Sequence, residues 1–318
     1  MCRLLAWACD EPLTVAAALR EPDFEAFTDL SRQHADGWGM AWWPAHQQHV
    51  APNVATSTTC AADDPRYHAL THEAAGDLGM VHLRWATPGL PVVEANTHPF
   101  VRGQWAFAHN GAIHPQDRLD EILPSGWKSR MSGTTDSERY FLAIAAQMEE
   151  GASARDAVAT VVEHIFATFE PTSLNAVLMG PDALYIIAAY EPSRVPVLGA
   201  SSGGGSGSDR LDTTFYDLQY RRRVDTVMVA SSGLPRRLGD EWEPLPNMSL
   251  LRIVVGSSAT STATPPRSPS PSRPVPCSFR ATLSIFARTI QSSTALGAPR
   301  PSPPLQAPLG PALVSTCA

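Results

Sequence analysis

The chain begins with Met1 and Cys2, and a cysteine at the second position can have two roles. Methionine is normally removed before a small residue, and its removal gives Cys2 a free α-amine with a reference pKa of about 7.7 to 8.0. That amine can take the thiol proton and later return it to a leaving group, so Cys2 could be a nucleophile with its own base. The alternative is an inert, buried cysteine at the start of a strand.

Polar segments that contain glycine follow several apolar runs, and one of them offers two hydrogen-bond donors. Asn110 has a side-chain amide, and Gly111 has an unhindered backbone N–H. Two such donors after a strand are what an oxyanion hole requires. Because Asn-Gly is also the commonest hairpin turn, a tight turn is the alternative.

Two charged residues could recognise the two ends of an α-amino acid. Arg84 lies in a strand-like run, where a buried guanidinium needs an anionic partner, either a ligand carboxylate or an internal Asp or Glu. Asp136 precedes the helical segment SERYFLAI, where it could cap the helix or bind an ammonium group. Together they would hold the carboxylate and the ammonium, and Cys2 and Asn110 would face the side-chain carbonyl.

Histidines and cysteines show no metal-ligand pattern. The histidines at positions 82, 98, 109 and 114 lack an H-E-x-x-H or similar spacing, and the five cysteines form no C-x-x-C pair. We therefore expect hydrogen-bonded structural histidines, no metal and no cofactor.

The apolar patterns predict the elements that must position these residues. Runs rich in β-branched and aromatic residues predict strands at about 3–8, 37–43, 78–86, 104–109, 174–180, 184–190, 226–231 and 250–255. Helical spacing of Ala, Leu, Glu and Met predicts helices at about 65–75, 137–149 and 153–168. This order favours an α+β fold with a mixed or antiparallel sheet over a regular βαβ alternation. We interpret the Gly- and Ser-rich stretch around Gly203 as a flexible surface loop.

Composition divides the chain in two. The sequence has 318 residues, of which 43% are hydrophobic, which is enough for a substantial core. From about residue 257 onward Pro, Ser, Thr and Ala dominate, so we predict one domain over 2–256 and a disordered tail over 257–318. The segment FRATLSIFARTI in this tail could form a short helix, but we expect disorder there as well.

Charge and apolar patterning exclude some partners. The net charge of −7 argues against a nucleic-acid partner, and we interpret the one dense basic run, at 221–223, as a solvated turn. Asp10 and Glu11 end the N-terminal apolar run too early for a signal peptide or a membrane span. The odd number of cysteines suggests a reducing compartment, so we expect a cytoplasmic protein without a membrane partner.

The order of the motifs resembles the class II glutamine amidotransferases, a family of N-terminal-nucleophile (Ntn) hydrolases. The resemblance covers about residues 2–256 and rests on Cys2 after Met1, DGWG, R-x-A-T, NTHPF, HNG and TTDSE. It implies a four-layer αββα sandwich. It also implies that Cys2 is the nucleophile, with its freed amine as the base, and that Asn110 and Gly111 form the oxyanion hole.

The same resemblance implies the substrate-binding positions. Arg84 would hold the substrate carboxylate and Asp136 its ammonium group. Thr87 and His98 are the other pocket residues that it implies.

The implied activity is hydrolysis of a γ-glutamyl amide through a thioester. Because nothing after residue 256 could fold into a synthase, the match is to lone-domain members similar to the γ-glutamyl-hercynylcysteine S-oxide hydrolase of ergothioneine biosynthesis. The substrate would be a small γ-glutamyl compound, either glutamine feeding a separate ammonia-consuming synthase or a conjugate such as the ergothioneine-pathway intermediate. An inactive binding or regulatory module is the alternative.

Overall fold

The computed structural model describes residues 2–44, 50–87, 89–181, 183–194, 214–234, 242–254 and 280–286. The stretch around Gly203 and most of the predicted tail lie outside these residues.

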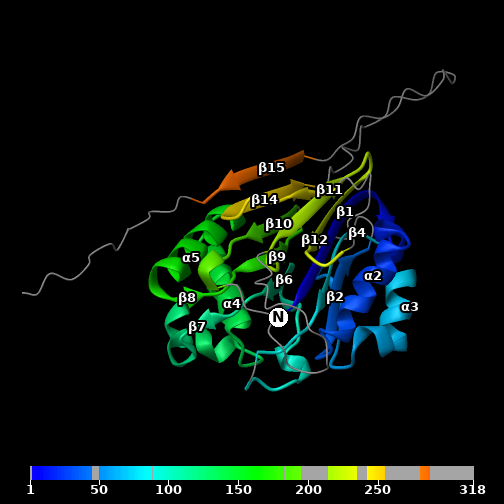
Figure 1. Ribbon diagram of the computed structural model, residues 1–318. Coiled ribbons are helices and arrows are strands. Elements are labelled where there is room, and N and C mark those ends of the chain that lie inside the picture. Colours follow the sequence, from blue (N-terminus) through cyan, green and yellow to red (C-terminus); the bar gives the residue numbers. More distant parts are fainter. Residues whose placement is uncertain are drawn as a thin grey trace, which may run out of the picture. The chain divides into compact units, whose positions relative to one another are not determined.

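A seven-stranded antiparallel sheet contains the start of the chain (Figure 1). Its strand order is β13-β11-β12-β1-β4-β2-β3. The bounds of these strands are Glu243–Pro244 (β13), Leu218–Arg222 (β11), Thr226–Ser231 (β12), Arg3–Leu13 (β1), Gly76–Leu83 (β4), Trp38–Trp43 (β2) and Asn53–Ser57 (β3). Strand β1 lies in the middle and is paired on both sides, to β12 and to β4.

A six-stranded antiparallel sheet packs against the first, in the order β15-β14-β10-β9-β6-β5. Its strands are Arg280–Ile285 (β15), Ser249–Val254 (β14), Ala183–Ala188 (β10), Asn175–Met179 (β9), Trp105–Asn110 (β6) and Phe100–Arg102 (β5). The short strands β7 (Ile113–His114) and β8 (Glu170–Pro171) pair separately.

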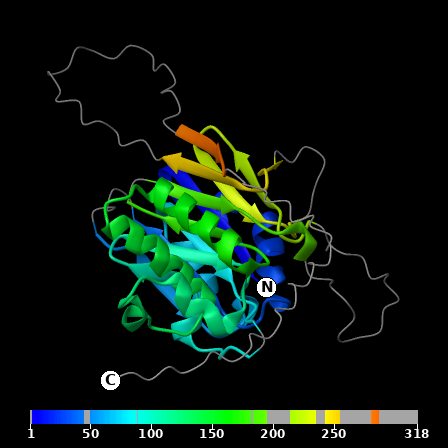
Figure 2. The same ribbon diagram turned by 90° about the vertical axis from the view of Figure 1, so that its left-hand side faces the viewer.

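Helices cover the outer face of each sheet. The seven-stranded sheet is covered by α1 (Val15–Leu19), α2 (Asp23–Asp29) and α3 (Pro65–Glu73). The six-stranded sheet is covered by α4 (Asp136–Glu149) and α5 (Ala154–Thr168), which lie in front of it in Figure 2.

Three apolar layers hold these elements together. Side chains alternate along β1, so that Leu4 and Ala6 face the second sheet while Leu5 and Trp7 face the helices. Because both faces of β1 are covered here, its residues 4–9 form a continuous apolar run. The α+β fold with an αββα order of layers is confirmed.

Strand β15 differs from the prediction of disorder or a short helix at this part of the sequence. Its six residues pair in register with β14, and the following Phe286 is 6% exposed in the core beside α4 and α5. The alternation of polar and apolar residues in RATLSI suits an edge strand, but Pro- and Ser-rich flanks hide this signal in the sequence.

The basic run at 221–223 also differs from the prediction, because its first residue is not solvated. Arg221 is 4% exposed, forms an ion pair with Asp23 at 2.9 Å, and lies over the ring of Trp242. A buried guanidinium is stable there because a carboxylate and an aromatic ring replace its water.

Over the described ranges, no helix combines the length and the apolar character needed to cross a membrane.

Candidate active site

Strand β1 places Cys2 at one end of the sandwich. Arg3 pairs with Leu83 of β4, and the backbone N–H of Leu4 donates to Ser231 Oγ at 2.9 Å. Cys2 directly precedes these fixed residues and is 8% exposed. Its position is therefore set by the central strand of the sheet rather than by a loose terminus.

Two segments contact Cys2. Its backbone nitrogen donates to Asn110 Oδ1 at 3.0 Å. Its Sγ lies 3.4 Å from the backbone nitrogen of Trp85 and 3.5 Å from the carbonyl oxygen of the same residue. In the processed chain this nitrogen is the α-amine, so the amine and the thiol of Cys2 both have defined neighbours.

The electrostatics of the site keep the Cys2 thiol protonated. Burial raises its pKa above the usual value, and the Asp136 carboxylate raises it further. The N-terminal amine, the contact with Trp85 and the Arg84 guanidinium act in the opposite direction but do not cancel the effect of burial. A nucleophile in this state needs a base to remove its proton.

The amide of Asn110 is fully buried, and its two ends differ. Its oxygen accepts from Cys2, whereas its Nδ2 has no hydrogen-bond partner among the described residues. A buried, unpaired donor is costly unless a ligand satisfies it. The unpaired Nδ2 is therefore a hydrogen-bond donor available to a ligand at this site.

Gly111 follows at a position that admits no side chain. A Cβ there would lie 1.9 Å from the carbonyl oxygen of Ser173 and 2.8 Å from His109 Nε2. Strand β6 pairs with β9, and β7 pairs with β8, so Asn110 and Gly111 do not form a tight hairpin between β6 and β7.

A hydrogen-bonded brace supports the turn after Gly111. Ala112 N donates to Thr172 Oγ1 at 3.0 Å, and Thr172 N donates to the Ala112 carbonyl at 2.8 Å. The Tyr216 hydroxyl donates to Thr172 Oγ1 at 3.1 Å. The sequence analysis did not find Thr172 or Tyr216, because only the fold brings them to this turn.

Arg84 emerges from the end of β4 beside Cys2 and is 3% exposed. Its guanidinium donates to the carbonyl oxygens of Asp36 at 3.4 Å and Pro91 at 3.0 Å. No carboxylate in the described part of the chain forms an ion pair with it. Although burial lowers the pKa of Arg84, the Asp36 carboxylate still acts on it electrostatically and raises that pKa, so the internal acid is a neighbour of the guanidinium without a direct ion pair.

Asp36, in the segment HADGWG, holds the loop that follows Arg84. Its Oδ2 accepts from Ala86 N at 2.8 Å, and backbone bonds join Arg84 N to Gly37 O at 2.8 Å and Asp36 N to Arg84 O at 3.1 Å. This carboxylate shapes the loop beside Cys2 and was not assigned from the sequence, although an Asp-Gly pair before a strand could have suggested it.

Asp136 is the first residue of α4 but not its cap. The cap is Thr135, whose Oγ1 accepts from Glu138 N at 3.1 Å. The buried Asp136 carboxylate instead accepts from Ile113 N at 2.9 Å and from Ser137 N at 2.9 Å. The first bond directs it toward the turn that contains Gly111.

The histidines behave differently from one another. His109 is hydrogen-bonded as expected, to Ser137 Oγ and to the Ser173 carbonyl, both at 2.9 Å. His82 and His98 are buried with their ring centroids 4.2 Å apart; in the described ranges His98 has no hydrogen-bond partner, and His82 has only a weak one, the backbone of His109. Burial lowers the pKa of His82 to about 3 and that of His98 well below its usual value. Both rings are therefore neutral.

The predicted site residues divide into two groups in space. In the first group, Asn110 is hydrogen-bonded to Cys2, and the charges of Arg84 and Asp136 change the pKa of the Cys2 thiol. Thr87 is half-buried on the loop after Arg84, and its carbonyl accepts from Leu90 N at 3.0 Å. His98 packs against His82 and Phe100 and forms no hydrogen bond with the other predicted site residues in the ranges that the structure describes. Among the described residues, no group of three or more His, Cys, Asp or Glu is arranged to hold a metal ion.

Comparison with known families identifies this arrangement. The sequence profile of the class II glutamine amidotransferases matches residues 1–195. The chain belongs to this family. The match includes every site residue that the sequence predicts.

Two curated members show what the chain is similar to. It is 38% identical over 160 residues to glutamine–fructose-6-phosphate aminotransferase of Zymomonas mobilis. This aligned region covers 50% of this chain but only 26% of that protein. It is 26% identical over 262 residues to γ-glutamyl-hercynylcysteine sulfoxide hydrolase of Mycobacterium tuberculosis. Here the aligned region covers 80% of this chain and 93% of that protein.

Solved structures share the fold of the family. A glutamine aminotransferase class-II domain protein from Silicibacter pomeroyi superposes with a TM-score of 0.53 at 18% identity, over 90% of this chain and 100% of that one. The allosteric regulatory enzyme of purine biosynthesis also has a TM-score of 0.53, at 14% identity, over 80% of this chain and 47% of that one.

Proposed function

We propose that this chain hydrolyses γ-glutamyl amides, with Cys2 as an N-terminal nucleophile. One observation carries the proposal: the buried Asn110 amide bonds the nitrogen of Cys2 through its oxygen and leaves its nitrogen unpaired. This orientation suits both a base at the amine and an oxyanion at Nδ2.

The reaction follows from this geometry. The neutral α-amine of Cys2 takes the thiol proton, and the thiolate attacks the γ-carbonyl carbon. Nδ2 of Asn110 and the Gly111 N–H stabilise the tetrahedral oxyanion, which collapses when the leaving amine takes the proton from the Cys2 ammonium. Water, deprotonated by the same amine, then attacks the thioester and releases glutamate.

Substrate recognition in this proposal relies on two opposite charges. Arg84 is buried and forms no direct ion pair among the described residues, so a bound α-carboxylate would give its guanidinium a directly paired anion. Asp136 would bind the α-ammonium from the start of α4. Both residues contribute positioning rather than bond-making, and Thr87 and His98 shape the surrounding pocket.

The extent of similarity favours a reaction completed within this domain. The match spans 93% of the hydrolase of Mycobacterium tuberculosis but only 26% of the aminotransferase. In addition, Trp85 is 39% exposed while its backbone contacts the thiol, so its side chain would offer apolar surface near the site to a leaving amine larger than ammonia. We therefore place γ-glutamyl conjugates, such as the hercynylcysteine sulfoxide conjugate of ergothioneine biosynthesis, ahead of free glutamine.

The test measures glutamate release from L-glutamine and from γ-glutamyl-hercynylcysteine sulfoxide. We expect turnover of at least one compound by the wild type, none by Cys2→Ala, and unchanged turnover by the matched control Cys60→Ala. Faster release from the conjugate would support the hydrolase assignment, and faster release from glutamine would indicate a separate ammonia-consuming partner. An active Cys2→Ala protein would contradict the proposal.

A further inference from the structure

The loops that carry Arg84 and Asp136 are joined by a single buried amide. Asn96 is 1% exposed and ends a short 3-10 turn, Glu94–Asn96. Its Nδ2 donates to the Pro91 carbonyl at 3.2 Å, and its Oδ1 accepts from Thr134 N at 2.8 Å. Its Nδ2 also donates to Thr134 Oγ1 at 3.3 Å, so this one side chain bonds both loops and holds the second through its oxygen and its nitrogen.

The Pro91 carbonyl is also a partner of the recognition arginine. Arg84 donates to this oxygen at 3.0 Å, so Arg84 and Asn96 share one acceptor. A change in the position of Asn96 would therefore move the oxygen that orients the Arg84 guanidinium.

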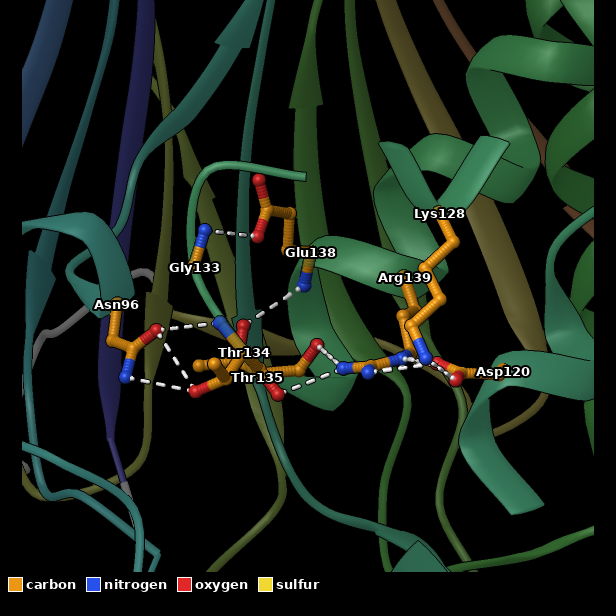
Figure 3. A network of polar contacts seen from close by, with 8 residues as sticks. All are labelled: Asn96, Asp120, Lys128, Gly133, Thr134, Thr135, Glu138 and Arg139. Atoms are coloured by element: carbon orange, nitrogen blue, oxygen red, sulfur yellow. Dashed lines mark hydrogen bonds and ion pairs between the residues drawn. The ribbon is translucent and has the colours of Figure 1, made fainter. Parts of the chain in front are cut away.

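On the other side, Asn96 holds a tight loop that leads into α4 (Figure 3). Thr134, which Asn96 binds, lies two residues before Asp136. Gly133 admits no side chain, because a Cβ there would lie 2.4 Å from Asn96 Oδ1. The Glu138 carboxylate accepts from Gly133 N at 2.8 Å and fixes the loop from within α4.

The far side of this loop is anchored independently of Asn96. Arg139 donates to the carbonyl oxygens of Thr134 at 2.7 Å and Thr135 at 3.0 Å. Asp120 binds Arg139 and Lys128 on the side of the loop away from Asn96, as Figure 3 shows. Loss of Asn96 would thus leave the loop folded but remove its register against the Arg84 loop.

We propose that Asn96 is a positioning residue that sets the spacing between the Arg84 guanidinium and the Asp136 carboxylate. This inference rests on the proposed function and deepens it. A ligand that carries both an α-carboxylate and an α-ammonium group must engage both charges at once, whereas a ligand with one of them can adjust to either residue alone. Asn96 therefore selects α-amino acids over one-ended analogues.

The experiment uses L-glutamate, which is the product whichever amine leaves. Calorimetry would compare the Kd of L-glutamate with those of glutarate, which lacks the ammonium, and 4-aminobutyrate, which lacks the α-carboxylate. We expect Asn96→Ala to weaken L-glutamate binding about fivefold to tenfold, and to change binding of the two analogues by less than about twofold.

A matched control separates positioning from stability. Asn247 also bridges two segments, since its Oδ1 accepts from Tyr190 N at 2.9 Å and its Nδ2 donates to the Tyr190 carbonyl at 3.0 Å. Asn247→Ala should lower the Tm without changing any of the three Kd values. Equal weakening of all three ligands by Asn96→Ala, or no weakening, would overturn this inference alone. A wild-type protein that binds no L-glutamate would contradict both the proposed glutamyl-binding site and this inference.

Discussion

At the residue scale, the proposed catalysis depends on buried polar groups that a ligand would complete. Asn110 Nδ2 has no hydrogen-bond partner, and Arg84 has no direct ion pair, among the described residues. In the proposed reaction, a substrate carbonyl and a substrate carboxylate would pair with these two groups.

Asn110→Asp tests the first of these groups, because it keeps the shape of the side chain and removes its donor. We expect kcat to fall about 10² to 10³-fold with KM changed by less than about threefold, because the donor acts on the oxyanion and not on the bound amide. Steady-state kinetics with the preferred γ-glutamyl amide would measure this. A kcat within about fivefold of wild type would show that Nδ2 does not contact the developing charge.

The raised pKa of the Cys2 thiol predicts the pH dependence of the reaction. Since the thiol is protonated at neutral pH, activity requires the neutral form of the α-amine, whose reference pKa is about 8. The value of kcat/KM should therefore rise with pH, about tenfold per unit below that pKa, and then level off. A profile that is flat from pH 6 to 9 would mean that the thiolate forms without the amine.

At the element scale, the candidate site lies where β1 begins and where β4 and β6 end. The long apolar runs predicted all of the strands that carry site residues, namely β1, β4 and β6, as well as helix α4. Shorter or more polar elements, such as β3, β5, β11 and the helices α1 and α2, were not predicted, because their stability comes from packing against the sheets rather than from their own sequence pattern.

The residues that support the predicted site residues could not all be predicted from the sequence, for a related reason. Cys2, Arg84, Asn110 and Asp136 carry motif signals of their own. Asn96 belongs to the NTHPF motif, but its bond to Thr134, 38 positions away, could not be read from that motif. Thr172 and Tyr216 carry no motif signal and bond each other across 44 positions. No local pattern encodes such a pair.

The buried histidines of β4 and of the segment before β5 predict acid sensitivity. Their folded-state pKa values lie below the unfolded value of about 6.5, with that of His82 at about 3, so the unfolded chain binds more protons between these values. The free energy of unfolding should therefore be constant above about pH 7.5 and fall as the pH drops through 6.5, by up to about 1.4 kcal/mol per unit for each histidine.

Urea unfolding from pH 4 to 8 would measure this dependence. His82→Phe should reduce the slope of the free energy of unfolding against pH by the contribution of one proton. This holds whatever the substitution does to stability at neutral pH. Phe100→Leu is the matched control, because it disturbs the same cluster without removing a titrating group. An unchanged slope in His82→Phe would contradict the assignment of neutral, buried rings.

At the scale of the whole molecule, the domain extends beyond the boundary that composition predicts. The described residues 280–286 belong to the fold, because β15 covers the edge of β14 and Phe286 is buried in the core. The layered fold itself was predictable, because the motifs that indicate the family also imply its sandwich. The edge strand was not, because it lies within a Pro- and Ser-rich sequence.

Two truncated chains test this boundary. A chain that ends at Ala287 should keep the wild-type Tm, whereas one that ends at Gly256 loses β15 and the burial of Phe286 and should melt roughly 5 to 10 °C lower. Scanning calorimetry would measure both. Equal Tm values for the two chains would place the end of the domain at 256.

The most direct test of the central claim is the intact mass of the purified protein before and after treatment with 6-diazo-5-oxo-L-norleucine, an electrophilic mimic of glutamine. We predict that Met1 is absent and that one adduct forms per chain, on Cys2, with protection by the γ-glutamyl substrate. A protein that retains Met1 and forms no adduct would show that Cys2 is a structural cysteine and that the site does not perform this chemistry.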